Sequence, residues 1–208
     1  TGYNMVIDPK ENDGIFRYIL NTWSGIYRRS FIEKYHIRHN TTPGASFQDN
    51  GFWFQTFCLA KRVYFVNRPY YMNRRDNPNS SVKSRKKVYC MNEEYRFIHD
   101  FLDRHPELKP YFIKVYSMQR FRNYFTTYNR IDRKFRKEYL KTMSEELREA
   151  DRKNELDQKY FTPFEWKKIV KIMEDPSSAG VWMAVSTSAR RMKQSIRNLR
   201  RVVNGKRI

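Results

Sequence analysis

Apolar side chains recur every three or four positions from residue 88 onward, the spacing that places them on one face of an α-helix. The first stripe consists of Val88, Met91, Tyr95, Ile98 and Leu102, the second of Tyr111, Val115, Met118, Phe121, Phe125 and Tyr128, and the third of Phe135, Tyr139, Met143 and Leu147. His105-Pro106 ends the first stripe, because proline cannot continue a helix. The pattern predicts three successive helices.

Two further helices are predicted towards the C-terminus. Thr162-Pro163-Phe164-Glu165 is typical of a capping box with proline at the first helical position, so a short helix begins there and ends before Asp175-Pro176. A last apolar stripe then consists of Val185, Ala189, Met192, Ile196, Leu199 and Val203. Basic residues fill its other faces, and no acidic residue follows Asp175, which predicts a basic amphipathic helix.

The first 82 residues have a more mixed pattern. Thr22 to Tyr27 is typical of a short strand or a turn, and Arg29 to Tyr35 of one or two helical turns. Asn50 to Ala60 is apolar enough for a buried helix, although periodicity alone also allows a strand. Arg62 to Val66 and Arg68 to Arg74 are predicted strands, the second with a proline that places it at an edge.

This change of pattern places a soft boundary near Ser81 to Lys83. We expect an α/β part of few short strands in residues 1–82 and a mostly α-helical region in residues 83–208. The chain has 208 residues, of which 39% are hydrophobic and 16% aromatic, enough for a globular core built largely from rings. No run of about 18 apolar residues exists, so a spanning helix is not predicted.

A net charge of +20 indicates an anionic partner. Charge alone does not distinguish nucleic acid, a phospholipid surface and a phosphorylated or nucleotide-linked substrate. Cys58 and Cys90 do not have the spacing of a metal site, and two cysteines are too few for a disulfide framework. We therefore expect buried thiols in a reducing compartment.

One acidic residue stands between a glycine-bearing loop and an aromatic segment, in Gly44-Ala45-Ser46-Phe47-Gln48-Asp49-Asn50-Gly51-Phe52-Trp53. A carboxylate held within reach of a hydroxyl can remove its proton, and N–H groups at a helix start would keep Asp49 ionised at neutral pH. The alternative is that Asp49 only caps the helix, because Asp is a favoured N-cap residue.

Three motifs occur in order around this acid: Trp23-Ser24-Gly25-Ile26-Tyr27-Arg28-Arg29-Ser30-Phe31, then Phe47-Gln48-Asp49 with Phe52, then Arg68-Pro69-Tyr70-Tyr71 with Arg74 through Ser80. Their order and spacing over residues 1–82 resemble the second half of the catalytic domain of bacterial family 2 glycosyltransferases. The helical remainder resembles the variable C-terminal extension of such enzymes.

The resemblance implies a GT-A fold and an inverting transfer from a nucleotide-sugar donor to a saccharide or lipid-linked acceptor, in cell-surface polysaccharide synthesis such as that of a capsule. It implies that Asp49 is the catalytic base. Many members carry Glu-Asp where this chain has Gln48-Asp49, and Gln48 is expected to bind the acceptor or to brace the loop. The nucleotide-binding first half, which holds the divalent metal (Mg or Mn), has no counterpart here. We therefore expect a truncated enzyme, inactive without the missing N-terminal half.

Further site residues follow from chemistry and from the resemblance together. Trp23 and Trp53 offer ring faces to acceptor sugars, with a core role as the alternative. Arg74 and Arg75, with Ser80, are expected to bind donor phosphates, with a solvated arginine pair as the simpler account. No metal site is predicted within the chain, since a site ordinarily needs three or four ligands.

The basic C-terminal helix has two interpretations. It can dock on an anionic membrane surface, placing the enzyme peripherally on the inner face of the cytoplasmic membrane, or it can pack on the domain with a solvated basic face. The residues expected at the membrane surface are Trp182, Arg190, Arg191, Arg197, Arg200 and Arg201.

The main competing class is a basic helical nucleic-acid-binding protein, for which arginine and aromatic residues would supply phosphate contacts and stacking platforms. It does not account for the ordered motifs, so no nucleic acid is expected as partner. A noncatalytic module that binds a membrane or a protein partner is a third class.

Overall fold

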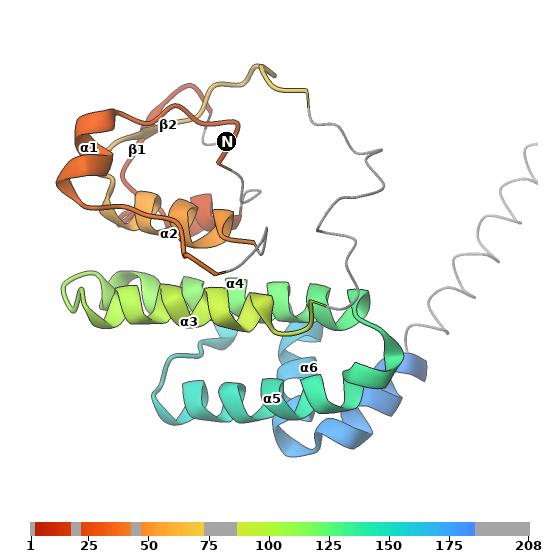
Figure 1. Ribbon diagram of the computed structural model, residues 1–208. Coiled ribbons are helices and arrows are strands. Elements are labelled where there is room, and N and C mark those ends of the chain that lie inside the picture. Colours follow the sequence, from red (N-terminus) through yellow and green to blue (C-terminus); the bar gives the residue numbers. More distant parts are fainter. Residues whose placement is uncertain (1–2, 18–21, 43–46, 73–86, 186–208) are drawn as a thin grey trace, which may run out of the picture.

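Two layers of helices make up the second half of the computed structural model, which describes residues 3–17, 22–42, 47–72 and 87–185 (Figure 1). Helices α3 (Cys90–Asp103) and α4 (Lys109–Arg130) lie side by side in the middle layer. Helices α5 (Arg133–Arg152) and α6 (Pro163–Glu174) pack together in the layer below. The described part of the chain is thus mostly helical, as the apolar stripes predict.

The buried faces follow the predicted stripes, with one adjustment on α4. Tyr95, Ile98 and Leu102 of α3 are wholly buried. On α4 the predicted Tyr111 is 53% exposed and Phe112 takes its place in the core, because the buried face is turned by one residue at the start of the helix. The spacing determined the face, and tertiary packing determined its rotation.

Above these layers lies a smaller lobe made of the first part of the chain (Figure 1). Helix α1 (Arg29–Lys34) and helix α2 (Asp49–Leu59) form as predicted. The 3-10 helix η1 (Asp13–Arg17) places Phe16 against α2 and α4, with ring centroids 5.3 Å from Trp53 and 5.4 Å from Phe112. Rings from three separate segments therefore close the top of the core.

The sheet is smaller than the sequence predicts. Strands β1 (Val6–Ile7) and β2 (Val63–Tyr64) pair antiparallel, with Val6 opposite Tyr64. The predicted strand from Arg68 to Arg74 is wrong over its described residues, which have no strand structure. Proline has no N–H to donate there, and with Met72 97% exposed the segment has no buried face to hold it in a sheet.

The predicted boundary near residues 81–83 lies outside the described residues. On either side of it, one continuous core extends from Ile7 to Met183. Buried hydrogen bonds also cross it, since the Gln119 amide of α4 donates to the Phe16 carbonyl at 2.6 Å. The upper lobe and the helical layers are therefore packed as one unit.

Helix α6 begins with the predicted capping box. Thr162 accepts from the Glu165 N–H, and the Glu165 carboxylate accepts from the Thr162 N–H. Residues 176–185 are again helical and bury Ala179 and Met183. The segment just before the predicted basic stripe thus packs on the domain. Of the stripe itself only Val185 is described, and it is exposed, while residues 186–208 lie outside the described residues.

Candidate active site at the start of α2

Asp49 is the first residue of α2, next to the N-cap Gln48, and its side chain is half-buried. Burial raises its pKa, which the backbone N–H groups of Asp49 and Asn50 and the charge of His39 only partly offset. We expected the helix start to keep this carboxylate ionised. The pKa of Asp49 is nevertheless raised, because the loss of water around the carboxylate has a larger effect than the hydrogen bonds from the helix N–H groups.

The loop before α2 is held by two polar contacts. The Gln48 amide donates to the carbonyl and hydroxyl of Thr42 at 2.9 and 3.1 Å. Gln48 therefore braces the loop, which is one of the two roles that the sequence suggested for it. The Nδ1 atom of His39 lies 3.2 Å from the Gln48 carbonyl oxygen, and its ring stacks on Phe52 with centroids 4.5 Å apart. These contacts hold the backbone just before Asp49 and the Phe52 ring in the first turn after it.

A second carboxylate, which sequence reasoning missed, lies beneath this turn. Glu94 of α3 is 0% exposed. It accepts a hydrogen bond from the Gly51 N–H at 2.7 Å and another from the Asn40 amide at 3.2 Å. Burial first, and then the charge of Asp49, raise the pKa of Glu94 to about 7.

A signal for Glu94 is present in the sequence. It lies three residues after Met91 and one before Tyr95, within the apolar stripe of α3. An acid on the buried face of a helix needs a partner, because an unpaired buried charge is strongly destabilising. Such an acid marks a polar contact in the core, although the sequence does not identify the partner.

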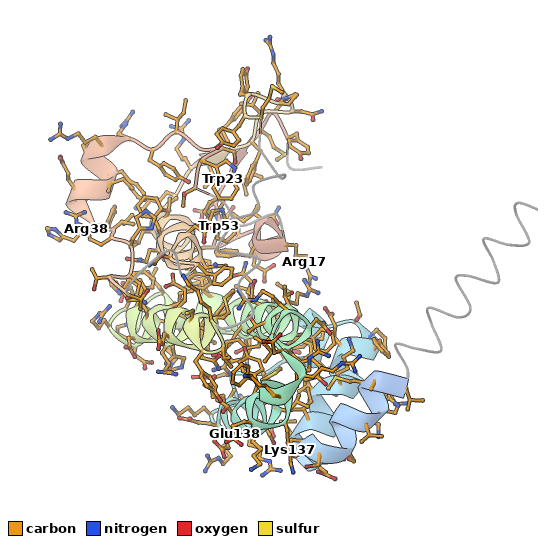
Figure 2. The ribbon with its side chains drawn as sticks, turned by 45° about the vertical axis from the view of Figure 1, so that its right-hand side comes forward. Arg17, Trp23, Arg38, Trp53, Lys137 and Glu138 are labelled. Carbon is orange, nitrogen blue, oxygen red and sulfur yellow. The ribbon has the colours of Figure 1, made fainter. Side chains whose placement is uncertain are left out.

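The two predicted acceptor-binding tryptophans have different surroundings (Figure 2). Trp53 on α2 is only 3% exposed and stacks on Phe57 with centroids 4.1 Å apart, which is the core role left open by the sequence. Trp23 is 43% exposed in the upper lobe, where its ring centroid lies 6.2 Å from that of Tyr71. Only Trp23 therefore presents ring surface to solvent.

The predicted donor phosphate-binding residues Arg74, Arg75 and Ser80 lie outside the described residues, as do Arg190, Arg191, Arg197, Arg200 and Arg201 of the predicted membrane surface. Trp182, the remaining member of that surface, is half-buried. Its ring packs on Phe164, and Lys167 and Lys171 lie over it. Trp182 is thus part of the contact between α6 and the following helix.

Within the described residues, His99, Asp100 and Asp103 are grouped closely enough to offer three metal ligands. The Lys109 ammonium lies 2.5 Å from Asp103, and the two ring nitrogens of His99 face Asp103 and Glu155 at 3.1 and 3.0 Å. This group is an ion-pair network between α3, α4 and the segment after α5. His99 and Asp103 are thus already engaged with Lys109 and Glu155.

Comparison of the chain with protein-family models, with curated proteins and with solved structures found no match. Among the described residues, no helix is both long and apolar enough to cross a membrane. The interpretation of the site therefore depends on its residues and their geometry.

Proposed function

We propose that this chain is the acceptor-side part of an inverting family 2 glycosyltransferase in which Asp49 is the catalytic base. The observation that carries the proposal is the position of Asp49, half-buried at the start of α2 in a loop braced by Gln48 and His39. A general base works best with a pKa near the working pH, and burial shifts Asp49 in that direction.

The proposed step is a single displacement. Asp49 takes the proton of an acceptor hydroxyl while the hydroxyl oxygen forms a bond to the anomeric carbon of the donor sugar. The bond from that carbon to the nucleoside diphosphate breaks, and its electron pair leaves with the diphosphate. A divalent metal (Mg or Mn) bound outside this chain would offset the charge of the diphosphate.

The distribution of exposed apolar side chains also supports a partner domain. Ten of the exposed large hydrophobic residues belong to the upper lobe: Tyr3, Met5, Val6, Trp23, Ile26, Tyr64, Val66, Tyr70, Tyr71 and Met72. Val6 and Tyr64 are cross-strand neighbours, so part of this surface is continuous on the small sheet. An exposed apolar surface of this kind favours coverage by another protein part, for which we propose the nucleotide-binding half.

Replacing Asp49 with Asn in the intact enzyme tests the assignment. We expect turnover to fall at least ~10²-fold, because Asn cannot accept the proton, while the melting temperature is preserved. Asp151→Asn, at an exposed position of α5, is the matched control and should leave turnover unchanged. Release of nucleoside diphosphate from donor and acceptor measures both.

Near wild-type turnover of Asp49→Asn would refute the base assignment. If the chain then also bound unrelated oligonucleotides with a steep salt dependence, the nucleic-acid-binding class would be favoured instead.

We also propose that the basic C-terminal segment attaches the enzyme to the inner face of the cytoplasmic membrane. Each basic residue near an anionic surface contributes about 1 kcal/mol. Because Ala179 and Met183 are buried, truncation after Val185 removes the basic segment and keeps the packed part. We expect this truncation to abolish sedimentation with phosphatidylserine-containing vesicles at about 0.1 M salt. Undiminished sedimentation would contradict membrane attachment.

A further inference from the structure

We infer that Glu94, from the helical region, is a positioning residue for Asp49, holding both the first turn of α2 and the loop before it. The inference rests on the proposed function. One oxygen of Glu94 accepts from the Gly51 N–H at 2.7 Å and the other accepts from the Asn40 amide at 3.2 Å. Gly51 is two residues after Asp49, and Asn40 is next to His39, so one carboxylate joins both sides of the loop.

The fit between α3 and α2 is close at this point. A Cβ atom at Gly51 would lie 2.5 Å from the Glu94 carboxylate and 2.9 Å from the Phe97 ring. Only glycine lets the two helices approach closely enough for the Gly51 N–H to reach the carboxylate. The absence of a side chain at residue 51 and the acid at residue 94 are therefore two parts of one contact.

Holding the backbone does not by itself require an ionisable group. A buried neutral amide could accept from the same N–H, whereas a buried carboxylate is destabilised by the loss of water. Asp49 on α2 is the charged group that acts on Glu94, and it repels it. Tyr95, beside Glu94 on α3, is a neutral phenol whose own pKa is raised by burial first and also by the Glu94 charge. His39, in the loop, acts on Asp49 instead. The electrostatic partner of Glu94 is thus Asp49.

This pairing links the protonation of the two carboxylates. With Glu94 protonated, Asp49 ionises without a second negative charge nearby. When Glu94 loses its proton near pH 7, it becomes a stronger hydrogen-bond acceptor and makes Asp49 a stronger base. The helical region would then contribute to catalysis through the position and basicity of Asp49, without contacting the substrate.

The test compares Glu94→Gln, Glu94→Ala and Asp49→Asn in the intact enzyme. For Glu94→Gln we expect an unchanged KM for the donor and a kcat that no longer rises through pH 7, about tenfold below wild type at pH 8 and within about twofold at pH 6. Glu94→Ala also loses the acceptor for the Gly51 N–H, which Gln retains, and kcat should fall about 10²-fold through misplacement of the loop. A wild-type pH profile for Glu94→Gln would overturn the inference.

The outcomes separate the inference from the proposed function. If Asp49→Asn is inactive and Glu94→Gln retains the wild-type profile, the base assignment stands and the positioning role fails. If Asp49→Asn is active, the proposed function fails. The pairing is also measured on this chain alone by carbon NMR of the carboxyl groups: Glu94 should titrate near pH 7, and Asp49→Asn should lower its midpoint. An unmoved midpoint would refute the pairing.

Discussion

Replacing Glu94 with Gln should change the pH dependence of stability in a direction that the structure determines. The pKa of Glu94 is raised from 4.5 to about 7 in the folded protein. Between these values the folded state holds a proton that the unfolded state has released, so raising the pH through this window destabilises the fold. Below about pH 4.5 both states are protonated and the destabilisation is absent.

The magnitude follows from the same shift. One pKa unit corresponds to about 1.4 kcal/mol, so the shift from 4.5 to about 7 amounts to about 3 kcal/mol once both states are ionised. Most of this, about 2 to 3 kcal/mol, develops between pH 5 and pH 8. Gln carries no ionisable proton, so the free-energy difference of unfolding between variant and wild type should move in favour of the variant by that amount.

Urea unfolding of both proteins at pH 5 and pH 8 measures this difference. Other titrating groups contribute nearly equally to the two proteins and largely cancel in the comparison. Glu93→Gln, one residue away on the exposed face of α3, is the matched control, and its effect should be the same at both pH values. If Glu94→Gln has the same effect at both pH values, the buried-carboxylate argument is wrong.

The remaining predictions concern packing around the same turn and the buried thiol. Gly51→Ala should destabilise the fold by ~1–3 kcal/mol, because its methyl group would lie 2.5 Å from the Glu94 carboxylate, and thermal unfolding measures this. Gly180→Ala is its comparison, with a smaller expected loss because the atom it meets, at 3.1 Å, is the end of the Leu140 side chain. Burial raises the pKa of the Cys58 thiol, so iodoacetamide at pH 8 should alkylate it only after unfolding. Alkylation of Cys58 in the folded protein would contradict its place in the core.

Helix α3, in the middle layer, makes polar contacts with the layers on both sides. Asn92 donates to the Glu146 carboxylate of α5 at 3.2 Å, and Glu94, two residues further on, accepts from α2. Helix α3 therefore contacts both α5 and α2 through polar side chains two residues apart.

The helices of the second half and the capping box of α6 follow from the amino-acid sequence alone. These are local properties: a stripe with helical spacing needs only some apolar surface to bury itself against, and Thr162 and Glu165 satisfy N–H groups within their own turn. The sequence also indicated a buried element after Asp49, but left open between a helix and a strand what the structure shows to be helix α2.

The groups that surround Asp49, in contrast, depend on how the helices pack together. Glu94 is 43 residues from Gly51 along the chain, and no local pattern joins an acid in one apolar stripe to a glycine in another. The same holds for Trp53, whose burial depends on Phe16 from a third segment, and for the short sheet, whose length depends on a neighbouring strand. Periodicity encodes which face of an element is buried, whereas the partner on that face depends on how the elements pack.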